Sequence, residues 1–420
     1  MSALAGRRIV LGVTGGIAAY KAVEVCRRLV DAGAHVIPVL SSGAQRFVGE
    51  TTFSTLASEP VVRSLWDIGV DEPVPGRHTS PIPHTRLGQT ADLILVCPAT
   101  ARLIGTYAAG ISSDLLTATL IATTAPVVIC PAMHTEMWDH PAVQENLATL
   151  QRRGVRVVPP SEGRLAGGDH GRGRLAEPST ILDVVHGVLT PPSLAGVRVL
   201  VTAGGTREPI DPVRFIGNRS SGKQGHALAD EAAARGADVH LVTTVDRAAA
   251  AGVRCTRVDT AQEMHDVVLG ELGATDVVVM AAAVADFRPV GVADDKIKKD
   301  AGVPTVRLEP TPDILAAIGQ RRRGDQVVVG FAAETSSVRE HARSKLERKG
   351  ADLIVANDVA APSVGFEHDT NQVVVLVRDP AAETGVREVE VPLQSKRAVA
   401  AAVLDVVETL RNDRRVPPTR

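Results

Sequence analysis

The sequence is poor in aromatic residues and carries almost no excess of either charge. Only 2% of the 420 residues are Phe, Trp or Tyr, so a surface on which nucleic-acid bases stack is not expected. Lysine and arginine number 46 against 48 aspartates and glutamates, which leaves a formal net charge of −2. Without a basic surplus, binding to nucleic acid or to an anionic membrane surface has no electrostatic basis. The composition therefore predicts neither kind of partner.

Cysteine is also scarce, and no hydrophobic run is long enough to cross a membrane. The cysteines are too few and too scattered for a disulfide framework, and no CxxC pair suggests zinc. They are Cys26, Cys97, Cys130 and Cys255. The longest apolar run, VVVMAAAVA at 277–285, is about half of a membrane-spanning helix. No signal-peptide pattern precedes the first expected strand, so we expect a soluble protein of the cytoplasm.

The two halves of the chain begin in the same way. A chain of 420 residues is long enough for two or three domains, each with a buried core. Each half opens with a branched aliphatic strand, a glycine turn and a helix, and GAHV at 33–36 is matched by GADV at 236–239. The sequence TPPS at 190–193 marks the boundary between them. We therefore predict an α/β protein with two Rossmann-like, doubly wound domains, residues 1–190 and 191–420.

The first half opens with a βαβ pattern. Residues 8–13 (RIVLGV) are apolar on both faces, as expected of a central parallel strand, and residues 35–40 form the next strand. The helix between them is expected to direct five side chains to one side, Ile17, Tyr20, Val23, Val25 and Leu29.

The glycine turn of this βαβ unit predicts an anion site. In TGGIAA, Gly15 and Gly16 leave backbone N–H groups and a helix N-terminus open to a phosphate, and Ser41 and Ser42 end the second strand with small hydroxyls. The turn is not GxGxxG, and no acidic residue ends the second strand where a ribose hydroxyl would need one. The pattern therefore favours a mononucleotide over a dinucleotide.

Three strand ends of the first half are expected to meet. The strands in ADLILVCPATA and APVVICPAM end at 98–100 and 131–134, and the first strand ends at 12–16. Ligands of open α/β sheets bind beyond the carboxyl ends of the strands, so these segments should form one pocket. The glycine-dense, charged segment 161–178 has neither helical nor strand periodicity, and we expect it to form a mobile flap over that pocket.

The second half carries a long polar segment, VTAGGTREPIDPVRFIGNRSSGKQG at 201–225, between its first strand and a helix that begins near Lys223. A loop of this length in a compact domain is usually functional or disordered, and its varied polar residues argue against disorder. Its basic and amide side chains lie beside backbone donors that Gly204, Gly205 and Gly222 leave open. The segment therefore predicts a site for a nucleotide or a phosphorylated substrate.

These motifs resemble those of one family. GGTREPIDPVRFIGNRSSGK, AAAVADFRP, KIKK and GFAAET are similar to the ligase motifs, and TGGIAAYK, CPATA and PAMHTEMW to the decarboxylase motifs, of bifunctional coenzyme A biosynthesis proteins. In that family phosphopantothenoylcysteine decarboxylase is fused to phosphopantothenate–cysteine ligase. The resemblance covers nearly the whole chain, and it implies a decarboxylase at residues 1–190 and a ligase at 191–420.

For the first half the resemblance implies FMN and a catalytic histidine. Gly15, Gly16 and Ser41 would face the phosphate of FMN, and Pro98, Ala99 and Thr100 its ring system. The flavin would oxidise the cysteine thiol to a thioaldehyde, so that loss of CO2 leaves a stabilised enethiolate, which is then reduced. His84, which follows the proline-rich loop 68–83, matches the active-site histidine of the family, and imidazole suits a base near pH 7.

Two positions depart from the family pattern. His134, next to Met133 in PAMH, stands where an asparagine usually binds the substrate carboxylate, and imidazole can also donate to a carboxylate. Gly167 stands where the flap usually carries a proton-donating cysteine. We expect another acid, His170, Asp169 or a water molecule, to take over the role of the cysteine.

For the second half the resemblance implies CTP and Mg²⁺, because an unactivated carboxylate does not acylate an amine at neutral pH. An acyl-cytidylate would form, and the amino group of cysteine would then displace CMP. Asn218 matches the residue that holds the acyl-cytidylate, and Arg214 and Lys296 would offer positive charge. The remaining expected substrate contacts are Met280, Ala281, Ala282, Asp286, Pro312, Asp313, Ile314, Leu315, Phe331, Lys345 and Lys349.

Several alternatives stay open at this point. A flavin-dependent prenyltransferase or a peptidyl-cysteine decarboxylase would explain residues 1–190 but not the ligase motifs. A nicotinamide-dependent reductase would suit two Rossmann-like halves, yet neither opening turn is GxGxxG. The first half could also be a slow or regulatory flavoprotein beside an active ligase, because Gly167 replaces the cysteine. Family members assemble through both halves, so we expect a homo-oligomer with flavin sites near subunit contacts.

Overall fold

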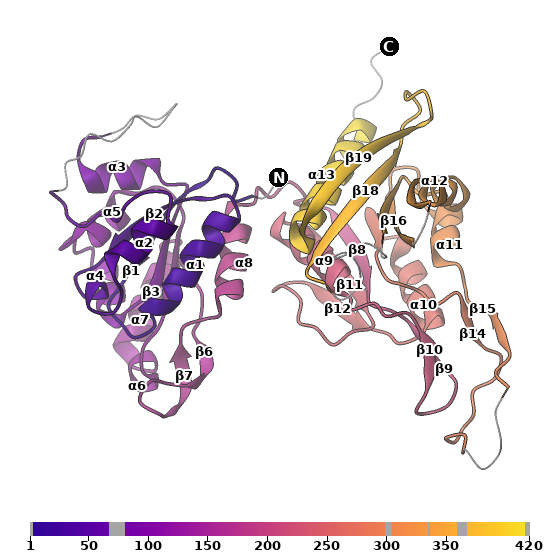
Figure 1. The fold of residues 1–420 in the computed structure, drawn as a ribbon, viewed down its shortest axis with the longest axis horizontal. Coiled ribbons are helices and arrows are strands. Elements are labelled where there is room, and N and C mark those ends of the chain that lie inside the picture. The colour runs from indigo at the N-terminus through magenta and orange to yellow at the C-terminus, as the bar shows by residue number, and fades with distance from the viewer. Residues whose placement is uncertain (1–2, 67–79, 299–304, 335–336, 359–367, 416–420) are drawn as a thin grey trace. The chain divides into compact units, whose positions relative to one another are not determined.

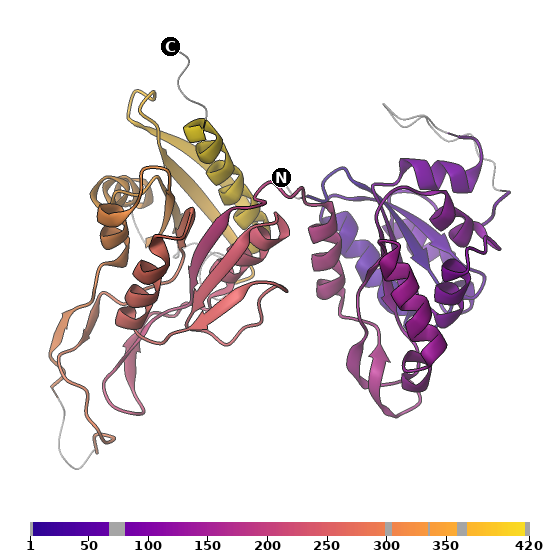
Figure 2. The same cartoon turned by 180° about the vertical axis from the view of Figure 1, so that it is seen from behind.

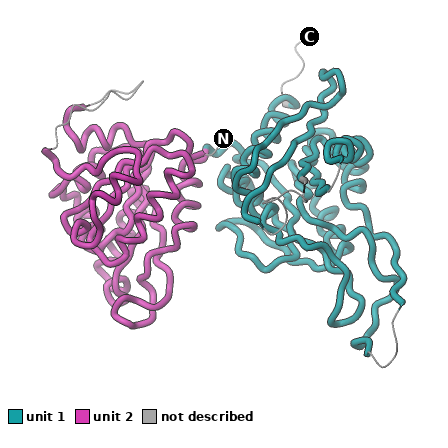
Figure 3. Tube along the Cα trace, in the orientation of Figure 1, with its two compact units in different colours: residues 1, 191–420 teal, residues 2–190 magenta. Residues whose placement is uncertain are grey.

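The computed structural model describes residues 3–66, 80–298, 305–334, 337–358 and 368–415. The chain divides into two compact units, Ser2–Thr190 and Pro191–Arg420 (Figure 3). Each has its own hydrophobic cores and its own main sheet, so each is described by itself. No helix in these described ranges is both long and apolar enough to span a bilayer.

The first unit alternates strands and helices along most of its length (Figure 1). Its elements are β1 (Arg8–Val13), α1 (Ala19–Asp31), β2 (His35–Leu40), the 3₁₀ turn η1 (Ala44–Arg46), α2 (Glu50–Leu56), α3 (Pro83–Thr90), β3 (Leu93–Ala99), α4 (Ala101–Ala108), α5 (Leu115–Ala122), β4 (Val127–Pro131), α6 (Thr135–Trp138), α7 (Pro141–Arg152), β5 (Arg156–Val157), β6 (Ser161–Arg164), β7 (His170–Arg174) and α8 (Pro178–Leu189).

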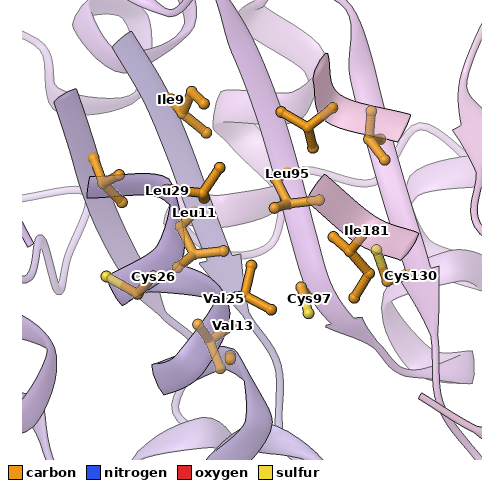
Figure 4. Close-up of a cluster of buried hydrophobic side chains, with 14 of the residues drawn as sticks. Ile9, Leu11, Val13, Val25, Cys26, Leu29, Leu95, Cys97, Cys130 and Ile181 are labelled. Atoms are coloured by element: carbon orange, nitrogen blue, oxygen red, sulfur yellow. The ribbon is translucent and has the colours of Figure 1, made fainter. Parts of the chain in front are cut away.

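The main sheet of this unit is fully parallel, in the order β2-β1-β3-β4-β5. This is the flavodoxin-like doubly wound order, and it confirms the predicted fold class for this half. Alternate residues of each strand face opposite layers of helices. Ile9 and Leu11 pack toward α1, α2 and α8, in the cluster drawn in Figure 4, while Val10 faces α3, α4, α5 and α7. The order of the strands reverses between β1 and β3, which is where such sheets bind their ligands.

Two expectations for this unit were wrong. Ile17 and Tyr20 do not belong to the buried side of α1, because each is 61% exposed; the buried face is made by Ala19, Ala22, Val25, Cys26 and Leu29. The flap segment is not irregular, since β6 and β7 form an antiparallel hairpin beside α6 (Figure 1). The strand period was hidden because most of the hairpin's strand positions are glycine or arginine, which give no alternation of apolar and polar residues.

The second unit continues from residue 191. Its elements are β8 (Arg198–Ala203), β9 (Arg207–Pro209), β10 (Phe215–Gly217), α9 (Lys223–Ala234), β11 (Asp238–Thr243), β12 (Arg254–Arg257), α10 (Ala261–Leu272), β13 (Val277–Met280), β14 (Phe287–Pro289), β15 (Leu308–Pro310), α11 (Ile314–Arg321), β16 (Val327–Glu334), α12 (Val338–Lys349), β17 (Leu353–Asp358), β18 (Thr370–Arg378), β19 (Val386–Ser395) and α13 (Lys396–Arg415).

The large sheet of the second unit runs β12-β11-β8-β13-β16-β17-β18-β19. Its first six strands are parallel and have the Rossmann order 3-2-1-4-5-6, and β18 and β19 extend it as antiparallel strands. Helices α9 and α13 cover one face and α10, α11 and α12 the other, so this half is doubly wound as predicted. The strand order reverses between β8 and β13. The hairpins β9–β10 and β14–β15 lie outside this sheet and extend from it (Figures 1 and 2).

Candidate functional site

The first unit contains a cavity of about 610 Å³ at the reversal of strand order between β1 and β3. This volume lies within the range of pockets that hold small molecules and cofactors. Six of the residues expected to bind cofactor or substrate line it, namely Gly15, Gly16, Pro98, Thr100, Met133 and His134. The tip of the β6–β7 hairpin closes one side, with Leu165, Ala166 and Gly167. The predicted convergence of the strand ends is therefore confirmed for these segments.

The turn after β1 is built to expose backbone donors. A Cβ on Gly15 would lie 2.6 Å from the carbonyl carbon of Gly43, so only glycine lets these two turns meet. Within the described residues, the N–H groups of Gly15, Gly16 and Ile17 make no hydrogen bond, and α1 begins two residues later without a side-chain cap. Such unpaired donors at the start of a helix form an anion site, which fits the phosphate of a flavin mononucleotide.

Thr14 fixes this turn against the end of β3. Its hydroxyl donates to the carbonyl of Pro98 at 2.7 Å and accepts from the N–H of Thr100 at 3.1 Å. Thr14 is only 3% exposed, so these bonds are shielded from water. Thr14 was not predicted as a site residue; it belongs to the TGG motif, but the role of its hydroxyl depends on a strand 84 residues away.

Three predicted residues lie outside the lining of this cavity. The hydroxyl of Ser41 accepts the N–H of Ala44 at 3.2 Å and so caps the turn into η1. Ala99 is completely buried at the end of β3. His84 lies in the first turn of α3, which begins at Pro83, and residues 68–79 of the loop expected at 68–83 fall outside the described ranges. Its Nδ1 atom is buried and has no hydrogen-bond partner among the described residues.

His134 is held between two carboxylates at the mouth of the flap hairpin. Its Nδ1 contacts Glu136, and its Nε2 lies 3.0 Å from Oδ2 of Asp169. The Glu136 carboxylate, and after it that of Asp169, raises the pKa of His134 above its usual value. A Cβ added at Gly167 would lie 3.6 Å from His134 Nε2. The two positions that depart from the family pattern are therefore neighbours in space.

Basic side chains also line the cavity. They are Lys21, Arg164 and Arg174. Lys21 Nζ is buried and makes no hydrogen bond within the described residues, although Glu177 Oε1 is 3.6 Å away and also accepts a 2.9 Å hydrogen bond from Arg174. An ammonium group that is buried without a full set of acceptors favours an anionic ligand nearby. Lys21 belongs to the TGGIAAYK motif but was not predicted as a site residue.

The long loop after β8 is ordered by the segment that follows β13. The side-chain amide of Asn218 donates to the carbonyls of Ala283 and Val284 at 3.3 and 3.2 Å. A Cβ on Gly205 would lie 2.5 Å from the carbonyl oxygen of Asn218, so the glycine turn and Asn218 are in close backbone contact. Asn218 remains exposed at the reversal of strand order, where a ligand of this sheet would bind.

Asp211 joins Arg214 to the KIKK segment. Its carboxylate accepts N–H groups of Val213, Arg214 and Ile297 at 2.9, 2.8 and 3.2 Å, together with the Arg214 guanidinium. Arg214 foremost, and then these N–H groups, hold the pKa of Asp211 far below its usual range. Lys296 precedes Ile297 and is exposed. Asp211, which the sequence analysis did not identify, is thus the buried residue that positions two predicted basic residues.

A second group of predicted residues meets around α12. Lys345 Nζ donates to the carbonyl of Phe331 at 2.7 Å, and Lys349 forms an ion pair with Asp313. Burial lowers the pKa of Lys345, Lys349 adds to the effect, and the charges of nearby carboxylates, including Asp286, oppose it. Lys345 and Lys349 therefore do not form a solvated helix face, although lysines four residues apart on a helix usually face solvent.

The remaining predicted contacts lie at the ends of strands or in the core. Met280 ends β13, and Ala281 and Ala282 follow it, half buried. Pro312 precedes Asp313, which caps α11 by accepting the N–H of Ala316, whereas Ile314 and Leu315 are buried between α11 and the sheet. Within the described ranges no three His, Cys, Asp or Glu residues gather as a metal site.

Comparisons with known proteins cover both units. The family model described as Flavoprotein matches residues 2–190, and that described as DNA/pantothenate metabolism flavoprotein C-terminal domain matches 194–410. The coenzyme A biosynthesis bifunctional protein CoaBC of Mycobacterium tuberculosis is 48% identical over 414 residues, covering 94% of this chain and 96% of that protein. CoaBC of Vibrio cholerae is 43% identical over 410 residues, covering 97% and 99%. A crystal structure of the C-terminal domain of a CoaBC protein is 38% identical, covers 53% of this chain and 99% of that chain, and has a TM-score of 0.45.

Proposed function

The chain belongs to the family of bifunctional coenzyme A biosynthesis proteins called CoaBC, and from this premise we propose that it catalyses two consecutive steps. The unit of residues 191–420 joins 4′-phosphopantothenate to cysteine with CTP and Mg²⁺. The unit of residues 1–190 then decarboxylates the 4′-phosphopantothenoylcysteine to 4′-phosphopantetheine with FMN, in the cytoplasm. The observation that carries the proposal is that six predicted residues line one cavity in the first unit, with support from Asn218 of the second unit, which contacts the segment after β13.

In the first unit FMN would supply an electron acceptor for the cysteine thiol, without which the substrate carboxylate has no electron sink. The N–H groups of Gly15, Gly16 and Ile17 would hold the phosphate of FMN. The hydrogen bond from the Thr14 hydroxyl to Pro98 would fix the position of that turn. Lys21 would balance the negative charge of the ligands. The flap hairpin would cover the substrate and exclude water from the reacting atoms.

His84 would act as the base in the cavity of a second copy of the chain. It does not line the cavity of its own unit, and its buried Nδ1 has no partner among the described residues. The proposed homo-oligomer with flavin sites near subunit contacts accounts for both facts. In a His84→Asn variant the product should stop at phosphopantothenoylcysteine. Mixing this variant with a variant that binds no FMN should restore decarboxylation, because a mixed oligomer then contains a site with FMN in one copy and His84 from the other. No recovery would assign His84 to its own cavity.

In the second unit the loop after β8 would hold the acyl group and the α12 region the nucleotide. Asn218 would orient the acyl-cytidylate, and Arg214 and Lys296 would neutralise the triphosphate. Lys345 and Lys349 would contact the nucleotide near Phe331. Mg²⁺ would enter with CTP, since this ion is commonly held by substrate phosphates and only one or two carboxylates.

One assay tests both halves. The purified protein is given CTP, Mg²⁺, cysteine and phosphopantothenate, and pyrophosphate and CO2 are measured. Pyrophosphate release that requires phosphopantothenate supports the ligase, and CO2 release by a yellow protein supports the decarboxylase. Pyrophosphate without CO2 would instead favour the second candidate, a ligase with a slow or regulatory flavoprotein unit, which the glycine at position 167 motivates.

A further inference from the structure

The proposed decarboxylation, on which this inference rests, needs a proton at its last stage. After CO2 has left, the carbon that carried it forms a C=C bond with the sulfur-bearing carbon, and the saturated product needs one proton and one hydride. The hydride is the electron pair that the thiol gave up in the first stage. The proton must come from an acid beside the substrate, and a side chain that lines the cavity is the shortest route.

The residues that line the cavity offer few acids of suitable strength. Their titratable side chains in the described part of the chain are Tyr20, Lys21, His134, Arg164 and Arg174. Phenols, ammonium and guanidinium groups hold their protons tightly at neutral pH, whereas imidazolium titrates near neutrality. The thiols nearest in sequence, Cys97 and Cys130, are completely buried in the core and do not line the cavity (Figure 4).

The contacts of His134 define its protonation state. Each ring nitrogen faces a carboxylate oxygen, Glu136 Oε2 at Nδ1 and Asp169 Oδ2 at Nε2. An ionised carboxylate only accepts hydrogen bonds, so both nitrogens must donate, and a ring with two N–H groups is the imidazolium cation. Both carboxylates also raise the pKa of His134, Glu136 more than Asp169. The ring is thus held as an acid at the edge of the cavity.

Nε2 is the nitrogen placed for transfer. It lies on the side of Gly167, where the absence of a side chain leaves the edge of the ring open toward the flap tip. Its partner Asp169 is 66% exposed, so this carboxylate can turn into solvent at little cost when a substrate occupies the cavity. Glu136 then still holds Nδ1 and fixes the orientation of the ring. No other titratable group contacts the ring among the described residues.

We propose that His134 is the general acid of the reductive half of the reaction, in place of a residue that binds the substrate carboxylate. The Nε2–H bond breaks and a C–H bond forms at the carbon that lost CO2, with the C=C electron pair making the new bond. The sulfur lone pair forms C=S, and the hydride stored in the first half adds to the sulfur-bearing carbon, giving the saturated thiolate. His134 is left neutral and regains a proton from solvent beside Asp169 and Glu136.

The test uses the full chain with FMN and 4′-phosphopantothenoylcysteine, and it measures CO2, unsaturated product and saturated product separately by mass. His134→Asn should still release CO2, but the ratio of saturated to unsaturated product should fall about 100-fold or more, the usual contribution of a general acid. In the double variant His134→Asn, Gly167→Cys the saturated product should return. Gly167 has no positive φ, and a Cβ there meets only Asp169 and His134, so the cysteine fits.

The other outcomes separate failure of the proposed function from failure of the His134 assignment. If the wild-type protein releases no CO2, the proposed function fails and not this inference alone. Equal losses of CO2 and of saturated product in His134→Asn would make His134 a substrate-binding residue, which overturns the proposal. So would an unchanged product ratio, or loss of saturated product in His170→Asn instead, since His170 is the histidine of the flap hairpin itself, at the start of β7.

A readout independent of turnover is the ¹⁵N spectrum of the His134 imidazole in the flavin-loaded protein. Both nitrogens should be protonated at pH 7 in the wild type. The midpoint of the titration should move to lower pH in Glu136→Gln and, by a smaller amount, in Asp169→Asn, following the order of their effects on the pKa. A single protonated nitrogen at pH 6 in the wild type would contradict the proposal.

Discussion

Replacing Gly15 by alanine tests the anion site of the first unit most directly. The added Cβ would lie 2.6 Å from the carbonyl carbon of Gly43, 2.7 Å from its Cα and 2.9 Å from its oxygen. These are backbone atoms of the turn after β2, so no side-chain rotation can relieve the contact. One turn must move away from the other until the closest pair reaches ordinary contact at about 3.4 Å, a shift of about 0.8 Å.

A shift of this size has two energetic consequences. Overpacking of a well-packed site costs roughly 1–3 kcal/mol of the free energy of unfolding. The N–H groups of Gly15 and Gly16 move with the turn, and a displacement of about 0.8 Å breaks a hydrogen bond of ordinary length to a phosphate. A hydrogen bond to a charged group contributes roughly 1.5–3 kcal/mol, so the affinity for FMN should fall about 10- to 150-fold.

The assay is FMN binding to the purified protein, measured by the quenching of flavin fluorescence, together with thermal unfolding. Gly187→Ala is the matched control, because Gly187 lies within α8 and a Cβ there meets nothing within 4 Å. It should leave FMN affinity unchanged and leave or slightly raise stability. Release of pyrophosphate by the other unit should be unaffected in both variants. A folded Gly15→Ala protein that binds FMN as tightly as the wild type would refute the placement of the phosphate.

Three further predictions concern single residues. Thr14→Val should lower the stability of the first unit by roughly 1–3 kcal/mol in urea unfolding, because it removes both hydrogen bonds of a buried hydroxyl and leaves the N–H of Thr100 without its partner. Thr14→Ser should retain the stability. The affinity for CTP, measured by calorimetry, should fall as pH rises through the lowered pKa of Lys345. The fall should therefore come at lower pH than for an ordinary lysine, and Lys345→Gln should remove this pH dependence of the affinity. Burial lowers the pKa of His226 to about 4, against a usual value of about 6.5. Between these pH values only the unfolded state takes up the proton, so the second unit should lose stability as pH falls from about 6.5 to 4. His226→Gln should reduce this pH dependence of stability in thermal unfolding.

The architecture could be predicted because local and global signals agree in this chain. The strand at 8–13 is apolar on both faces, and only a sheet covered by helices on both sides can bury such a strand. The repeat of GAHV and GADV then predicted two such sheets, and both have the strand orders of doubly wound folds. The flap hairpin was missed, because its strands pair over the cavity rather than in a core and therefore carry no apolar period.

The site was predictable where a motif follows a strand and was missed where a role depends on distant contacts. Gly15 and Pro98 line the cavity as expected, since parallel strands bring their carboxyl ends together. Thr14 and Asp211 were missed, because a buried hydroxyl or carboxylate is recognised by its partners, and these come from other strands or loops. The contact between His134 and the flap was likewise hidden, since 35 residues separate His134 from Asp169.

The two opening turns show how one βαβ pattern supports two chemistries. After β1 only five residues separate strand and helix, and the close approach of Gly15 to Gly43 presents unpaired N–H groups to an anion at the helix start. After β8 the chain inserts the β9–β10 hairpin before α9, and bonds from Asn218 and Asp211 fasten this insertion to segments after β13 and β14. A ligand there meets side chains from three segments as well as a helix start. Such a site can hold a nucleotide and a second reactant together, which an acyl-transfer step requires.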